Sequence, residues 1–144
     1  MSGRVHRPGF TLMEIVVAIA VVALLAGVSA PLLFRHVADA RVSAARAELS
    51  TLGIALETFA LHTGRYPLDR EGLDALVKAP QELADTWRGP YLRGGVPKDP
   101  WTNPYVYRVK LADGDYVLMS EGRDGRPGGV GEDADIILGQ RMAQ

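Results

Sequence analysis

The sequence predicts an α+β fold, in which a long N-terminal helix, membrane-spanning in its first half, packs on a small antiparallel β-sheet head. Residues 15–34 contain no charged side chain and are long enough for a spanning helix. Apolar residues then recur at helical spacing over residues 42–59. Residues 105–110 and 116–120 are typical of two short strands around an Asp113-Gly114 turn. The chain of 144 residues has room for one compact domain.

The uncharged run is the feature on which the N-terminal prediction depends. Its 20 residues would form a helix about 30 Å long, which matches the hydrocarbon thickness of a bilayer. A secretory signal peptide is one alternative, because the small residues 28–30 resemble a cleavage site. The run is long for such a segment, however, and Pro31 would follow the cut. A plain membrane anchor is the other alternative, and it has no need of the carboxylate of Glu14 at the front of the run.

Beyond the uncharged run, one apolar stripe predicts that the helix continues. The stripe has spacings of three and four residues and consists of Val42, Ala45, Leu49, Leu52, Leu56 and Phe59. It is too short for a sustained heptad repeat, so we expect it to pack on the chain's own head and not in a coiled coil. The helix should end at Thr63-Gly64, where glycine can take the left-handed capping conformation.

The head is predicted to combine short elements with one long ordered loop. Asp69 is a plausible N-cap for a short helix over residues 70–78. Residues 79–104 contain five prolines and should form a loop without regular structure. We expect four aromatic side chains to anchor it by burial: Trp87, Tyr91, Trp101 and Tyr105. A last short strand is expected near residues 136–138.

Residues 122–135, the acidic loop, combine glycines with carboxylates. Calcium is a hard cation that takes six to eight oxygen ligands, and a glycine-rich backbone can turn its carbonyls inward. The loop lacks the alternating acids of an EF-hand, and its one partial match to a calcium-binding nonapeptide is a single copy. Composition alone therefore leaves two alternatives open, a calcium site and a solvated turn.

Composition excludes several function classes. The formal net charge of −1 gives no basic surface for nucleic acid, so no nucleic-acid partner is expected. The absence of cysteine removes disulfides, thiol catalysis and zinc–thiolate sites. The three histidines are isolated in sequence, and the chain contains no nucleophile elbow or Walker loop. We therefore expect a protein that is not an enzyme.

The N-terminal motif Gly9-Phe10-Thr11-Leu12-Met13-Glu14, followed by the apolar run, resembles the type IV pilin and pseudopilin class of prepilins. The resemblance implies that a prepilin peptidase cuts after Gly9 and N-methylates Phe10. Residues 1–9 would then be a leader, 10–34 a transmembrane and filament-core helix, and 35–144 a soluble domain with helix 35–63 and head 64–144. Glu14 would be an assembly residue that pairs with the Phe10 amine. Pairing within one chain and pairing with a neighbouring subunit both remain open.

Motifs along the head resemble the G-type major pseudopilin of type II secretion: Tyr66-Pro67, Gly72-Leu73, Trp87-Arg88-Gly89-Pro90-Tyr91, Pro97-Lys98-Asp99-Pro100-Trp101, Asn103-Pro104-Tyr105 and Gly131-Glu132-Asp133-Ala134-Asp135-Ile136. The resemblance implies a type IV pilin-like head with structural Ca²⁺. Its side-chain ligands would be Asp124, Asp133 and Asp135. A backbone carbonyl at Glu121 would be a further ligand, although the family pattern usually has leucine at this position.

The resemblance implies a structural subunit that self-assembles into a periplasmic filament and helps export folded proteins across the outer membrane. Its partners would be further copies of itself, prepilin peptidase, an inner-membrane assembly platform, minor pseudopilins and membrane lipid. The chain would cross the inner membrane once, with its C-terminal domain in the periplasm. The alternatives are a type IV pilin or minor pseudopilin, and a membrane-anchored, calcium-dependent binding module. The mature N-terminus discriminates between filament subunit and binding module.

Overall fold

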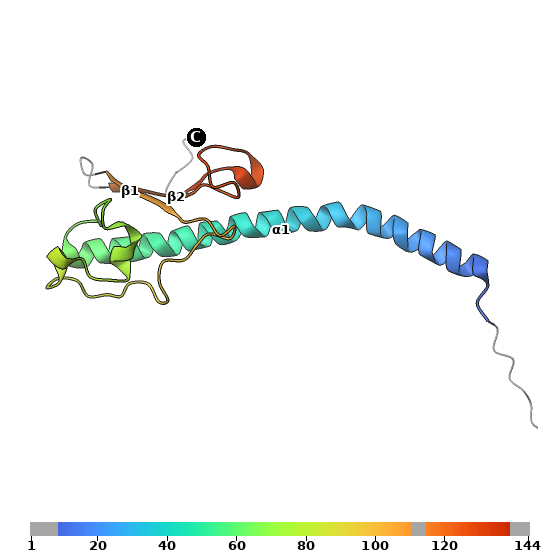
Figure 1. Ribbon diagram of the computed structural model, residues 1–144, viewed down its shortest axis with the longest axis horizontal. Coiled ribbons are helices and arrows are strands. Elements are labelled where there is room, and N and C mark those ends of the chain that lie inside the picture. Colours follow the sequence, from blue (N-terminus) through green and yellow to red (C-terminus); the bar gives the residue numbers. More distant parts are fainter. Residues whose placement is uncertain (1–8, 111–114, 139–144) are drawn as a thin grey trace, which may run out of the picture. The chain divides into compact units, whose positions relative to one another are not determined.

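A computed structural model describes residues 9–110 and 115–138, and it describes the side chains of these residues except in 26–35. It confirms the α+β class, with one long helix and a small antiparallel sheet (Figure 1). The helices are α1 (Leu12–Thr63) and the short 3₁₀ helices η1 (Gly72–Leu76), η2 (Gln81–Leu83) and η3 (Gly131–Asp133). The strands are β1 (Val106–Lys110), β2 (Asp115–Ser120) and β3 (Ile136–Ile137). The chain divides into two compact units, Met1–Val37 and Ala38–Gln144, and we treat each by itself.

In the first unit, Thr11 determines where the helix begins. Its Oγ1 atom accepts a hydrogen bond from the Glu14 N–H at 3.3 Å, as an N-cap side chain does for the third helical residue. Helix α1 therefore starts at Leu12, two residues later than predicted. Within the part of the chain that the structure describes, no helix is long and apolar enough to cross a membrane. The predicted span is therefore not confirmed.

In the second unit, the predicted apolar stripe of α1 forms the centre of the core. Five of its six members are buried: Ala45, Leu49, Leu52, Leu56 and Phe59. They pack with side chains of the head, among them Leu76, Tyr107 and Leu118. The stripe thus packs on the chain's own head, as its length and spacing predict. The helix ends where expected, because Gly64 adopts a φ of 80° and donates its N–H to the Ala60 carbonyl at 2.8 Å.

The sheet has the order β1-β2-β3, and both of its strand pairs are antiparallel. In the first pair, Tyr107 lies opposite Leu118, and both are buried. The other face of β1 carries the exposed Arg108, so buried and exposed side chains alternate along the strand. The predicted Asp113-Gly114 turn lies outside the described residues. Figure 1 shows β1 and β2 beside the C-terminal half of α1.

The prediction for Asp69 was wrong. The expected helix over residues 70–78 is the shorter η1, and its N-cap position is Glu71. The Asp69 carboxylate instead accepts a hydrogen bond from the Val109 N–H on β1 at 2.8 Å. Its partner is 40 residues away, so local capping signals gave no indication of it.

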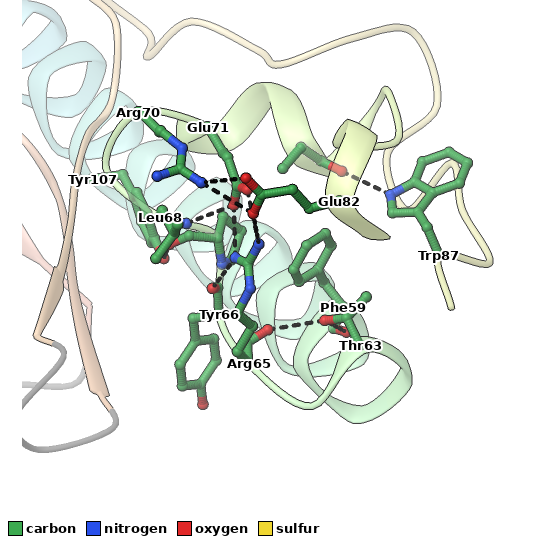
Figure 2. Close-up of polar contacts among 12 residues, drawn as sticks. Phe59, Thr63, Arg65, Tyr66, Leu68, Arg70, Glu71, Glu82, Trp87 and Tyr107 are labelled. Carbon is green, nitrogen blue, oxygen red and sulfur yellow. Dashed lines mark hydrogen bonds and ion pairs between the residues drawn. The ribbon is translucent and has the colours of Figure 1, made fainter. Parts of the chain in front are cut away.

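The proline-rich segment is mostly an ordered loop, as predicted, but it also contains the short 3₁₀ helix η2, which was not predicted. Aromatic side chains anchor the segment as predicted. Tyr105 is buried, whereas Trp87, Tyr91 and Trp101 are partly buried against the core. The Trp87 indole N–H donates to the Ala75 carbonyl at 2.9 Å (Figure 2). Trp87 therefore joins the loop to η1, an element that is already packed.

An ion pair closes the turn that follows α1. The Arg65 guanidinium donates to both carboxylate oxygens of Glu71, at 2.7 and 2.8 Å, and Figure 2 shows the two groups facing each other. Glu71 also accepts a hydrogen bond from the Leu68 N–H at 2.8 Å. Its side chain is largely buried, so this pair is better ordered than a typical surface salt bridge.

Lowering the pH is expected to remove the contribution of this pair to stability. The hydrogen bond from Arg65 lowers the pKa of the Glu71 carboxyl below its ordinary value of 4.5. The folded state binds this proton less tightly than the unfolded state. The contribution is therefore complete above about pH 4.5 and is lost as the pH falls through the lowered pKa. Melting temperatures measured below about pH 4.5 should fall less steeply with pH in Glu71→Gln. The control Glu82→Gln, which changes an exposed carboxylate, should show the same fall as the unchanged protein. An unchanged fall in melting temperature at acid pH in Glu71→Gln would show that the Arg65–Glu71 pair does not contribute to this pH dependence.

Candidate functional site

The acidic loop is closed at its base by the pairing of the last two strands. Ser120 at the end of β2 lies opposite Ile136 at the start of β3. Inside the loop, the Arg123 N–H donates to the Glu132 carbonyl at 2.8 Å. The two limbs of the loop are therefore held side by side, and the side chains of η3 face the first limb.

Two glycines allow this close approach. Gly122 has a φ of 64°, and a Cβ atom built there would lie 2.6 Å from the Glu132 carbonyl oxygen. Gly129 has a φ of 82°, and a Cβ atom there would collide with the Asp133 carbonyl. Only glycine fits both the conformation and the space at these positions. The glycine content of the loop thus has a steric cause.

The three predicted calcium ligands do not converge in the structure. Asp124 Oδ1 accepts a hydrogen bond from the Arg126 N–H at 3.2 Å. Both carboxylate oxygens of Asp133 accept hydrogen bonds from Arg123. Asp135 Oδ2 accepts one from the Gly128 N–H at 3.0 Å. Among the described residues, no three acidic or histidine side chains lie close enough together to hold a metal ion. As placed, these residues do not fit a calcium ion.

One oxygen of the loop stands out because it is buried without a partner. Asp135 Oδ1 makes no hydrogen bond in the described structure. A buried carboxylate oxygen without a donor is costly, so this atom would favour a nearby cation. Of the three predicted ligands, Asp135 is thus the one whose surroundings leave an oxygen available.

Arg123 is a loop residue that the sequence analysis missed. Its guanidinium donates to Asp133 through Nε at 2.9 Å and through Nη2 at 3.1 Å. A third contact, from Nη1 to Glu132 Oε2, measures 3.4 Å. The hydrogen bond to Asp133 raises the pKa of the Arg123 guanidinium further above its ordinary value. A basic residue inside an acidic loop was the available signal, because such a residue can neutralise the carboxylates.

Asp99 is a second residue whose role the sequence did not predict. It is only 4% exposed, and its Oδ1 accepts hydrogen bonds from the N–H groups of Trp101 and Asn103, at 3.0 and 2.8 Å. Its Oδ2 accepts a hydrogen bond from Ser120 Oγ at 2.6 Å. The carboxylate therefore joins the proline-rich loop to the end of β2.

Two neighbours of Asp99 extend this connection to the acidic loop. The Asn103 side-chain amide donates to the Gly122 carbonyl at 2.7 Å. The Trp101 indole N–H donates to Glu132 Oε1 at 3.2 Å. The proline-rich loop thus holds both limbs of the acidic loop, through side chains from one tight turn.

The predicted processing residues lie at the start of the first unit. Phe10 is 81% exposed, and a Cβ atom at Gly9 would meet nothing within 4 Å. Glu14 is exposed in the first turn of α1, where its N–H is capped by Thr11. Among the described residues, nothing packs around the peptide bond between Gly9 and Phe10. Its cleavage, the methylation of Phe10 and the assembly role of Glu14 stay predictions.

Comparison with known families identifies the chain. Residues 32–139 match the family described as type II secretion system (T2SS), protein G. The chain belongs to this protein G family. Residues 5–30 also match the prokaryotic N-terminal methylation motif, so the resemblance predicted at both ends of the chain is confirmed.

Similar proteins support the assignment to the protein G family. A type II secretion system core protein G of Pseudomonas aeruginosa is 35% identical over 92% of this chain and 95% of its own length. One from Vibrio cholerae is also 35% identical, over 90% of both chains. The crystal structure of the major pseudopilin from the type 2 secretion system of enterohaemorrhagic Escherichia coli superposes with a TM-score of 0.57 at 31% identity. The superposition covers 69% of this chain and 87% of the Escherichia coli chain. Family and fold together indicate a structural pseudopilus subunit.

Proposed function

We propose that this protein G family member is a pseudopilus subunit that self-assembles into a periplasmic filament and so helps export folded proteins across the outer membrane. The observation that carries the proposal is the N-terminal part of α1. Large apolar side chains are exposed there on all sides of the helix: Leu12, Met13, Ile15, Val16, Val17, Ile19, Val21, Val22, Leu24 and Leu25. A helix that is apolar all round is stable only when lipid or other protein covers it.

Lipid and neighbouring subunits would cover this surface in turn. The uncharged run continues beyond the described side chains as far as Phe34. On this sequence pattern we propose that the subunit first resides in the inner membrane as a single-pass protein with its C-terminal domain in the periplasm. It then moves into the filament, where copies of the same helix replace lipid. An assembly platform, minor pseudopilins and the prepilin peptidase would be its partners, and the chain is the peptidase's substrate and not an enzyme.

A second exposed face of α1 supports contact between subunits. It lies on the side of the helix opposite the core stripe, carries no charge and repeats every three or four residues: Ala40, Ala44, Ala47, Thr51, Ile54, Thr58 and Leu61. Ile54 is 69% exposed and Leu61 is 81% exposed. The Thr51 hydroxyl donates to the Ala47 carbonyl at 3.0 Å, so its polar group is satisfied within the helix. Such a face is suited to close packing against another helix or head.

The mature N-terminus tests the proposed processing and function. We expect mass spectrometry of the protein from its native membrane to show a chain that begins at Phe10 with a methylated amine. The exposed Gly9–Phe10 bond is suited to that cut. A chain that still begins at Met1, or that begins after Ala30, would contradict the filament proposal. Either result would favour a membrane-anchored binding module.

Calcium binding is a second, separate proposal, and the unpartnered Asp135 Oδ1 favours it. The described arrangement does not hold three carboxylates together, so the loop would have to rearrange before an ion could bind. Asp133 would have to give up its contacts with Arg123. Asp124 and Asp135 would supply the remaining carboxylates, and the role of the metal would be structural.

A further inference from the structure

We propose that the carboxylate of Glu132 fastens the acidic loop to α1, and that releasing it lets the loop leave the helix while the head stays folded. We call this carboxylate and its partners on α1 and on the proline-rich loop the strap. The inference goes beyond the filament proposal, and it requires no bound ion. It rests on the described contacts of one side chain, which lies between three segments that are far apart in the sequence.

The first step is the set of contacts that the Glu132 carboxylate makes. Its Oε1 accepts a hydrogen bond from the Trp101 indole N–H at 3.2 Å and lies 3.8 Å from Nη1 of Arg41 on α1. Its Oε2 lies 3.4 Å from Nη1 of Arg123 on the first limb of the loop. The Glu132 side chain is only 20% exposed. One carboxylate thus joins α1, the proline-rich loop and the acidic loop.

The second step is the backbone of η3, which holds Glu132 between these partners. The preceding Gly131 has a φ of 65°, and the Glu132 carbonyl accepts a hydrogen bond from the Arg123 N–H at 2.8 Å. The main chain of Glu132 therefore binds the first limb of the loop, while its carboxylate reaches Arg41 on the helix. A change of the Glu132 side chain leaves the main-chain contact in place.

The third step is that other contacts keep the loop closed when the strap is lost. Strands β2 and β3 pair at the base of the loop, and Arg123 donates to both carboxylate oxygens of Asp133. The Asn103 amide donates to the Gly122 carbonyl. These contacts do not involve the carboxylate of Glu132. Loss of the strap should therefore free the loop from α1 and leave its internal contacts intact.

The fourth step is the position of the strap on α1, beyond the edge of the core. Arg41 lies about one turn before Ala45, the first buried residue among the described side chains of α1. The Arg41 side chain is 47% exposed, so salt screens its pair with Glu132. The hydrogen bond from Trp101 has a neutral donor and is less sensitive to salt. The attachment to the helix is therefore the part of the strap that opens most readily.

The test measures the distance between the acidic loop and α1 in the full chain, in detergent micelles with chelator present throughout. The chain has no cysteine, so spin labels can be placed at two chosen exposed sites, Val130→Cys in the loop and Thr58→Cys on α1. Double electron–electron resonance then gives the fraction of molecules in which the loop has left the helix. An exposed ion pair shifts such an equilibrium by at most about fivefold, so Arg41→Gln should raise this fraction about threefold.

Three further measurements make the result specific. Glu132→Ala removes every carboxylate contact and should raise the fraction more than Arg41→Gln does. Arg46→Gln is the matched control, because it removes an exposed arginine of the same helix, and it should leave the distances unchanged. Sodium chloride at about 0.5 M should release the loop of the otherwise unchanged protein and have no effect in Arg41→Gln.

Unchanged distances in both Arg41→Gln and Glu132→Ala would overturn the strap. Equal release in Arg46→Gln would also overturn it, because net charge would then be the cause. Near-ultraviolet circular dichroism checks the head, and its loss in Arg41→Gln would contradict a release that leaves the head folded. The filament proposal is judged separately by the mature N-terminus. The calcium proposal is judged by the melting temperature of the unchanged protein, and equal values in calcium chloride and in chelator would end it.

Discussion

Replacing Asp99 with alanine is expected to lower the free energy of unfolding of the head by about 3 kcal/mol. The carboxylate is buried and accepts three hydrogen bonds, from the N–H groups of Trp101 and Asn103 and from the hydroxyl of Ser120. Alanine would leave these donors without their acceptor in a site that water does not reach freely. The loss should be measured by urea unfolding of the full chain in detergent, followed by near-ultraviolet circular dichroism of the tryptophans.

Two further variants separate hydrogen bonding from charge. Asp99→Asn keeps one acceptor oxygen of similar shape and should cost less than Asp99→Ala. Lys98→Ala changes the exposed neighbour and should leave stability within about 0.5 kcal/mol. A loss below about 1 kcal/mol in Asp99→Ala would show that Asp99 does not organise the head.

The same substitution should also loosen the acidic loop. Thr102, inside the turn that Asp99 holds, has a φ of 76°, a strained conformation for a β-branched residue. The turn carries Trp101 and Asn103, which bind the two limbs of the loop. Without Asp99 this strained turn is free to relax. Hydrogen exchange at the Arg123 N–H should therefore become faster, whereas exchange within α1 should not.

The elements that the sequence predicted well are those whose partners are close in sequence. The stripe from Val42 to Phe59 was predictable because helical periodicity alone determines which side chains share a face. The two strands around residues 111–114 were predictable because short runs with alternating side chains are a local signal. Gly64 marked the helix end through its own conformational preference.

The features that were missed depend on contacts between distant residues. Asp69 has the composition of a cap, but its partner Val109 is brought near only by the folded sheet. The carboxylates of the acidic loop were visible in the sequence, whereas the partner that each one takes was not. Asp133 binds Arg123 ten residues earlier, and Asp99 binds Ser120 21 residues later. Composition therefore located the site, and only the folded backbone could show which charges compensate one another.

Replacing Glu14 with valine is expected to leave processing intact and to reduce filament assembly at least about tenfold. In the proposed filament, the Glu14 carboxylate pairs with the charged amine that cleavage creates at Phe10, in surroundings where an unpaired charge is costly. The structure adds a competing, purely local role. Thr11 and Glu14 have the spacing of a capping box, and the Glu14 N–H already donates to Thr11 Oγ1. Loss of assembly in Glu14→Val could therefore follow from a weakened helix start.

Matched variants separate the two roles. Glu14→Gln keeps a capping-box side chain and removes the charge, whereas Thr11→Val removes the capping hydroxyl and keeps the Glu14 carboxylate. If the charge acts in assembly, Glu14→Gln should assemble as poorly as Glu14→Val. Thr11→Val should then still form filaments, with a cost limited to the about 1 kcal/mol of a lost cap. Filament yield by electron microscopy and cleavage by mass spectrometry measure both steps in the same cells. Normal filaments from Glu14→Gln would remove the charge from the assembly mechanism, and a matching loss in Thr11→Val would assign the effect to the helix start.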